Sequence, residues 1–192
     1  MLAAVPTMAT AAEVLSPEQV IATTADSFAT LVATRYAELE ADLDGIYDLI
    51  GEHLLPRFDL MSASHLILRG HWKTATPEQR QRFVDAFYRF LLASYGNALL
   101  EFHHDTIKIL PPEEHTAGAS TRVRTKLKLT DGSVFNVDFY MRLDDRGWRV
   151  VDVIAEGVSY VRTYRSEFGL EIRAGSLDAL TARLEDVAAG TP

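Results

Sequence analysis

The sequence predicts an α+β fold, in which helices wrap a curved antiparallel sheet of four strands. Up to about residue 103, apolar residues recur at the three- and four-residue spacing of helices. Between residues 106 and 154 they alternate with polar residues, as in strands with one buried face. After Gly157 the helical spacing returns. No repeat or long linker divides residues 13–192, so we expect them to form a single domain.

The composition limits the classes of function. The chain has 192 residues and a net charge of −8, with nine Asp or Glu and one Arg between residues 13 and 56. A nucleic-acid-binding surface normally carries the opposite charge, which argues against a nucleic-acid partner. Cysteine is absent, so neither disulfides nor thiolate metal sites can form.

Residues Met1 to Ala12 are small, apolar and uncharged, and Ala9-Thr-Ala11 resembles a signal cleavage site. We interpret this segment as the remaining part of a secretory signal, and a disordered N-terminal arm is the alternative. The mature chain is then expected to begin close to Glu13. No stretch of the sequence reaches the ~20 apolar residues of a membrane span.

The first helix is predicted by a capping box. Ser16-Pro-Glu-Gln19 places Ser at the N-cap, Pro at the first helical position and Gln where it can reach back to the cap. The helical pattern weakens near Asp42. Shorter helices are expected from Ile46 to Leu54, because Pro56 disfavours continuation, and from Asp59 to about Leu68.

A second capping box, Thr76-Pro-Glu-Gln79, starts the longest helix, which is expected to reach about His103. Its apolar residues cover more than a single stripe. Either the helix is a core helix packed on two sides, or one face packs on the sheet and another lines a cavity. The apolar residues are Phe83, Val84, Phe87, Tyr88, Phe90, Leu91, Leu92, Tyr95, Ala98, Leu99 and Phe102.

The expected strands run from Thr106 to Leu110, Arg122 to Leu129, Phe135 to Leu143 and Trp148 to Ile154. A hairpin turn at Asp131-Gly132 joins the second and third. Alternation gives the sheet one apolar face and one wet face. The wet face carries a basic row, which is either a solvated surface or a docking surface for a partner. This row consists of Arg122, Arg124, Lys126 and Lys128.

The last predicted strand turns through Gly157 directly into an amphipathic helix from Val158 to Ile172. A helix in this position must cross an edge or mouth of the sheet. A final helix starts at Ser176 and carries Leu177, Leu180, Leu184 and Val187.

No catalytic or metal-binding pattern is present. The six His residues form no His-Glu-x-x-His or related spacing, so we expect no metal site. An isomerase or dehydratase on such a sheet is the alternative function, and it would need a carboxylate or His that faces an apolar pocket. Alternation turns Asp138 and Tyr140 to the wet face. Asp152 and Glu156 remain, and we interpret them as polar braces at the strand-to-helix corner.

Three groups of residues resemble one known family. The first group is Asp152–Ser159, together with Glu167-Phe-Gly169 and Leu177–Leu184. The second is Ala75–Arg80 followed by Phe83 and Phe87, and the third is Tyr95-Gly96 with Leu99. In this order and spacing they resemble the MlaC family, also called the toluene-tolerance family, which comprises periplasmic phospholipid-shuttle proteins of the Mla pathway. The resemblance implies a cone-like sheet of the nuclear-transport-factor type with an apolar lipid cavity.

The resemblance further implies a periplasmic carrier that is not an enzyme, holds phospholipid as cargo without a cofactor, and moves it between the outer and inner membranes. The implied docking partners are an outer-membrane lipoprotein complex and an inner-membrane ABC transporter with a ring-shaped lipid-binding subunit. We expect a monomer.

A lipid cavity requires apolar walls, because two acyl chains of some thirty methylenes cost on the order of 25 kcal/mol to expose to water. Arg162 and Arg165 lie beside the apolar stripe of the helix after Gly157, and we expect them to contact the head group at the mouth. The expected wall residues are Val84, Phe87, Tyr88, Leu91, Leu92, Tyr95, Val123, Leu127, Phe135, Val137, Phe139, Met141, Val151, Val153, Val158 and Val161.

Overall fold

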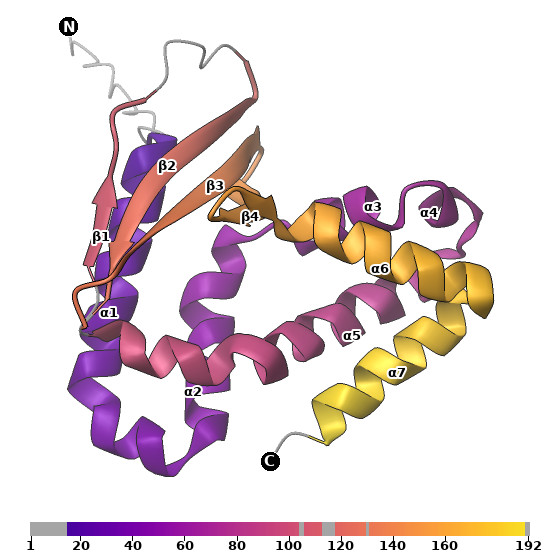
Figure 1. The fold of residues 1–192 in the computed structure, drawn as a ribbon, viewed down its shortest axis with the longest axis horizontal. Helices are drawn as coiled ribbons and strands as arrows, with labels where there is room; N and C mark the ends of the chain where they lie inside the picture. Colours follow the sequence, from indigo (N-terminus) through magenta and orange to yellow (C-terminus); the bar gives the residue numbers. More distant parts are fainter. Residues whose placement is uncertain (1–14, 104–105, 113–117, 130, 191–192) are drawn as a thin grey trace, which may run out of the picture.

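The structure, a computed structural model, describes residues 15–103, 106–112, 118–129 and 131–190 (Figure 1). The segment predicted as a signal, residues 1–12, lies outside this range. The elements follow in the order α1 Pro17–Ala41, α2 Leu43–Leu49, η1 Ile50–Leu54, η2 Leu55–Arg57, α3 Leu60–Leu68, α4 Gly70–Thr74, α5 Pro77–Tyr95, η3 Gly96–His103, β1 Thr106–Ile109, β2 Ser120–Lys128, β3 Val134–Asp144, β4 Gly147–Ala155, β5 Val158–Ser159, α6 Tyr160–Ala174 and α7 Leu177–Ala189.

The α+β class is confirmed, but the sheet has five strands instead of the predicted four. It is antiparallel throughout, in the order β1-β2-β3-β4-β5, and the two-residue β5 pairs with the end of β4. Positive φ values of 47° at Glu156 and 80° at Gly157 fold the chain back tightly enough for this pairing. The helix α6 therefore begins at Tyr160 and not at Val158, with Ser159 as its N-cap.

A β-bulge bends the sheet. The register of β3 on β4 shifts between Tyr140 and Met141, which pair with Asp152 and Val150 and leave Val151 as the extra residue. Bulges bend a strand and increase its twist, so this one curves the sheet around the helices on its covered face. Helix α1 runs along that face and contacts β1, β2 and β4 (Figure 1).

The opposite face of the sheet is largely wet, as alternation predicts. The side chains of Arg122, Lys126 and Lys128 are exposed there. Asp138 is an exception, because it is only 8% exposed. Its carboxylate accepts a hydrogen bond of 2.8 Å from Arg122 Nε, and this ion pair compensates for the burial of its charge.

The helices form two groups, which lie at opposite ends of the molecule in Figure 1. In the first group, α1, α2 and η1 share a buried apolar cluster. In the second, α3, α5, α6 and α7 pack around the rings of Phe83, Phe87 and Phe168, whose centroids lie 5.8 to 6.1 Å apart. The first cluster consists of Phe28, Val32, Leu39, Ile46, Leu49 and Ile50.

The long helix predicted to reach His103 ends as an α-helix at Tyr95 and continues as the 3-10 helix η3. The junction is Gly96, which is buried against the ring of Tyr47. A Cβ atom at Gly96 would lie 2.5 Å from Tyr47 Cε1, so only glycine allows this approach of η3 to α2.

Both predicted capping boxes are present, and the one at Thr76 gives a testable expectation. Thr76 Oγ1 accepts from the amide of Gln79 at 3.2 Å, and Gln79 Oε1 accepts from the amide of Thr76 at 3.1 Å. We expect Thr76→Ala to lower the free energy of unfolding by about 1 kcal/mol in a urea titration. Thr76→Ser keeps the hydroxyl and should lose little. Equal losses in the two variants would contradict the capping role.

Candidate functional site

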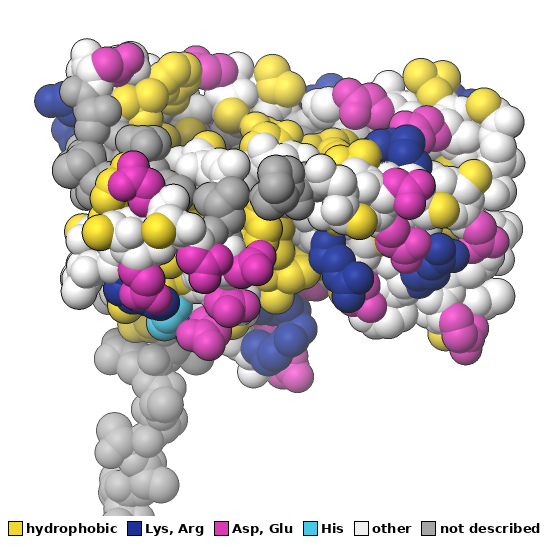
Figure 2. All heavy atoms as spheres, turned by 90° about the horizontal axis from the view of Figure 1, so that it is seen from below, with side chains coloured by type: hydrophobic (Ala, Val, Ile, Leu, Met, Phe, Trp, Pro, Cys, Tyr) yellow, Lys and Arg dark blue, Asp and Glu magenta, His cyan; other side chains and the backbone are white. Residues whose placement is uncertain are grey.

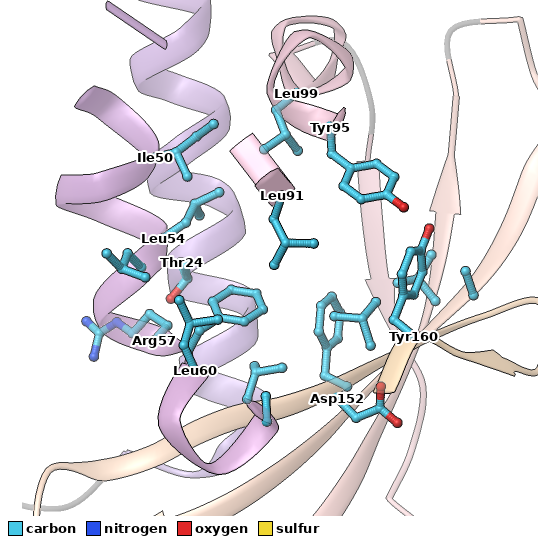
Figure 3. A pocket seen from close by; sticks show the side chains of 18 of the residues that line it. Thr24, Ile50, Leu54, Arg57, Leu60, Leu91, Tyr95, Leu99, Asp152 and Tyr160 are labelled. Carbon is cyan, nitrogen blue, oxygen red and sulfur yellow. The ribbon is translucent and has the colours of Figure 1, made fainter. Parts of the chain in front are cut away.

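A cavity of about 740 Å³ lies between the covered face of the sheet and the two helix groups (Figure 3). Strands β1 to β4 form one wall, and α1, α3, α5, α6 and the turns η1, η2 and η3 form the others. The lining side chains are nearly all aliphatic or aromatic. At roughly 30 Å³ per group, the space of a water molecule in the liquid, the cavity has room for about two dozen methylene groups.

Most of the predicted wall residues line this cavity. They come from three separate elements, namely the central helix α5, the covered face of the sheet and the start of α6. Leu91 projects toward the centre of the cavity in Figure 3. The predicted residues that line it are Phe87, Tyr88, Leu91, Leu92, Tyr95, Leu127, Val137, Phe139, Val151, Val153 and Val161.

The other predicted wall residues do not line the cavity, and three of them are buried elsewhere. Val123 and Met141 share the covered face with Val137, but α1 packs directly onto them, so they are part of a filled core with Val150. Val84 is buried on α5 away from the cavity.

Phe135 and Val158 were predicted as wall residues on the basis of alternation and helical spacing, and both are exposed. Phe135 lies at the start of β3 and is 42% exposed. Val158 belongs to β5 and is 59% exposed, because the helix begins after it.

The arginines expected at the mouth do not line the cavity. Arg162 is exposed on α6. Arg165 is half-buried, and its Nε donates a hydrogen bond of 2.9 Å to the carbonyl oxygen of Leu66 on α3. Burial, with the neighbouring charges of Arg69 and Arg162, lowers the pKa of Arg165. These arginines therefore lie outside the apolar walls.

One wall was missed in the sequence analysis. Ile21, Thr24 and Phe28 of α1 face the cavity at the three- and four-residue spacing of a helix, and that spacing could have identified them. Ile50 and Leu54 belong to η1, a π-helix whose wider turn no pattern in the sequence predicts. In Figure 3, Thr24, Ile50 and Leu54 lie across the cavity from Tyr95 and Tyr160.

Three tyrosines, Tyr95, Tyr160 and Tyr164, bring hydroxyl groups to the cavity. The hydroxyl oxygens of Tyr95 and Tyr164 lie 2.9 Å apart, and the rings of Tyr95 and Tyr160 meet edge-to-face at 5.7 Å. Burial, and secondly the hydrogen bond with Tyr95, raises the pKa of Tyr164 well above its usual range. Burial likewise raises the pKa of Tyr160. The hydroxyls of Tyr160 and Tyr164 are therefore uncharged at neutral pH.

This raised pKa predicts a loss of stability in alkali. In the unfolded chain Tyr164 ionises near the ordinary pKa of 10.0, whereas the folded chain resists ionisation. The contribution of this pKa difference to the free energy of unfolding is complete below pH 10. It is lost as the pH rises further, with a slope of about 1.4 kcal/mol per pH unit. Urea titrations followed by circular dichroism at increasing alkaline pH should show a shallower decline for Tyr164→Phe than for the wild type. Parallel declines would refute this source of the pH dependence.

The acidic side chains near the cavity have structural partners. Asp152 accepts from Ser159 Oγ at 2.5 Å and from the amide of Val161 at 3.0 Å, so it holds the N-terminus of α6. The Glu156 carboxylate accepts from the amide of Asn136. Both are thus the polar braces that the sequence predicts. Asp152 is the one acidic residue among the described cavity-lining residues, and it is already engaged at this corner.

Figure 2 shows hydrophobic side chains gathered through the middle of the lower face, bordered by acidic and basic side chains. Among the described residues, no helix is long and apolar enough to cross a membrane.

Comparisons with known proteins identify related chains. The family model described as MlaC protein matches residues 22–186. The toluene tolerance protein ttg2D of Pseudomonas putida is 31% identical over 170 residues, which cover 88% of this chain and 77% of that protein. The intermembrane phospholipid transport system binding protein MlaC of Haemophilus influenzae is 22% identical over 177 residues, which cover 90% of this chain and 82% of that protein.

A solved structure has the same fold. It is that of a phospholipid-binding protein from Ralstonia solanacearum in complex with a phospholipid. The TM-score is 0.84 at 22% identity, and the match covers 91% of this chain and 98% of the other. At this identity the likeness shows the fold alone.

Proposed function

The chain belongs to the MlaC protein family, and from that premise we propose that it binds phospholipid in the cavity and carries it between membranes. Residues 13–192 act in this proposal as a single lipid-binding domain, and the curved sheet with its helices forms a cone of the nuclear-transport-factor type. The related proteins named for phospholipid binding or transport support the assignment.

The apolar cavity is the observation that carries the proposal. Its 740 Å³ are enclosed by side chains such as Ile50, Leu91 and Phe139, which offer shape-tolerant contacts and few hydrogen bonds. Each methylene buried there is stabilised by about 0.8 kcal/mol relative to water. Such walls hold an acyl chain without selecting a single length, and they release it to any equally apolar acceptor.

The proposal extends to the cellular setting. The carrier works in the periplasm, without a catalytic step, and exchanges lipid with an outer-membrane lipoprotein complex and with an inner-membrane ABC transporter that has a ring-shaped lipid-binding subunit. Arg162 and Arg165 lie outside the cavity, so a contact of theirs with a head group or a partner would be made at the surface of α6.

Lipid extraction tests the proposed function. Protein purified without detergent is extracted with organic solvent, and the extract is analysed by mass spectrometry against a mock purification. We expect phospholipid in amounts comparable to the protein. Protein that contains no phospholipid, and takes up none from vesicles after delipidation, would refute the proposal.

A further inference from the structure

The hydroxyl groups of Tyr95, Tyr160 and Tyr164 gather at one side of the cavity that all three rings line. Tyr95 comes from the end of α5, and the others come from the first turns of α6. Figure 3 shows the hydroxyls of Tyr95 and Tyr160 pointing toward one another. Tyr164 is 6% exposed and Tyr95 is 39% exposed, so the cluster leads from the buried wall to the surface.

The cluster has more protons than its internal hydrogen bonds use. Tyr95 shares a hydrogen bond of 2.9 Å with Tyr164, and its ring meets that of Tyr160 edge-to-face at 5.7 Å. Each tyrosine hydroxyl carries one proton and can also accept. The hydrogen bond between Tyr95 and Tyr164 uses one of the three protons, so protons remain that can be donated to a group outside the cluster.

The other polar groups of the cavity offer less to a ligand. The Asp152 carboxylate already accepts from Ser159 and Val161. The Arg57 guanidinium points away from the cavity in Figure 3. Thr24 Oγ1, which is buried on the opposite wall, and Tyr88 Oη, which lies beside Gly51, are single hydroxyls. The tyrosines are therefore the main group of donors that lies both on the cavity wall and near the surface.

We propose that this tyrosine cluster donates hydrogen bonds to the phosphate oxygens of the bound lipid, an inference that rests on the lipid-binding function proposed above. The phosphate is an anion with strong acceptor oxygens, and neutral hydroxyls bind it without burying a second charge. Because the phosphate is common to all phospholipids, such a site recognises the class of lipid and tolerates different head groups.

A competition between two lipids tests the site. Delipidated protein is incubated with equal amounts of 1-palmitoyl-2-oleoyl-phosphatidylglycerol and 1-palmitoyl-2-oleoyl-glycerol, which share acyl chains and esters but differ in the phosphoglycerol head group. The protein is then repurified, and both lipids are quantified by mass spectrometry. The variant carries Tyr95→Phe, Tyr160→Phe and Tyr164→Phe together, which keeps the rings. Tyr140→Phe, outside the cavity, is the matched control.

We expect the triple variant to lose roughly tenfold or more of the preference for phosphatidylglycerol over diacylglycerol, the effect of lost hydrogen bonds to a charged group. Tyr140→Phe should keep the wild-type ratio. The ratio is read on folded, repurified protein, so a change in yield does not affect it. An unchanged ratio in the triple variant, or an equal loss of both lipids, overturns the inference. A wild type that binds neither lipid would instead refute the proposed function itself.

Discussion

Replacement of Arg149 by methionine is expected to lower the free energy of unfolding by about 3–5 kcal/mol, the cost of removing one partner from a buried ion pair. Arg149 lies on β4 and is 7% exposed. Its Nε donates to Asp144 at 2.9 Å, and its Nη2 lies 3.2 Å from Asp59 Oδ2. Methionine fills a similar volume but leaves both carboxylates without their cation.

The position of Arg149 explains why the effect should be large. Asp59 is the N-cap of α3, and its amide also donates to the carbonyl oxygen of Val150 at 2.8 Å. Arg149 therefore joins β4 to the start of α3, where Phe58 and Leu60 both line the cavity. Its loss should loosen that wall as well as lower stability.

The control for Arg149→Met is Arg35→Met. Arg35 pairs with Glu38 at 2.6 Å on α1, but both side chains are well exposed, so the pair is screened by water. We expect a loss of no more than about 0.5 kcal/mol there. Urea titrations of both variants give the comparison. A similar small loss in the two would show that Arg149 is not a buried structural link.

Local chemistry made much of this fold predictable. The capping boxes at Ser16 and Thr76 require only four successive residues each, and both form as predicted. Gly157 turns the chain at the predicted corner with Asp152 as its brace. In each case the side chain and its partner are close in sequence, so the local structure could be predicted from the sequence alone.

Contacts between distant segments could not be predicted in this way. Val123 and Val137 are both apolar, face the same side of the sheet and sit on neighbouring strands. They differ only in what covers them, since Val20 and Ile21 of α1 pack near Val123 whereas Val137 borders the cavity. The path of α1 across the sheet is a long-range property that alternation does not encode.

This difference between Val123 and Val137 leads to the second large prediction. Val137→Trp should place the indole in the cavity, so the variant should fold with an unfolding free energy within about 1 kcal/mol of the wild type when both are lipid-free. The ring then occupies space that acyl chains would fill. We expect phospholipid per folded molecule to fall well below the wild-type amount.

Val123→Trp is the matched control, because it makes the same change on the same face. Val123 is 2% exposed in a filled core, so overpacking should cost ~1–3 kcal/mol or more. Val134→Trp, at a position that is 53% exposed, should change neither quantity. Each protein is delipidated for a urea titration, and a second sample is extracted for lipid quantification by mass spectrometry.

The pair of measurements separates a cavity from a core at position 137. Loss of lipid with stability retained means that the side chain borders space used by the cargo. A large loss of stability with lipid per folded molecule unchanged would mean that Val137 is ordinary core and that the cargo lies elsewhere. If the cavity holds acyl chains, Leu91→Trp, which approaches the same space from α5, should reproduce the lipid loss from the opposite wall.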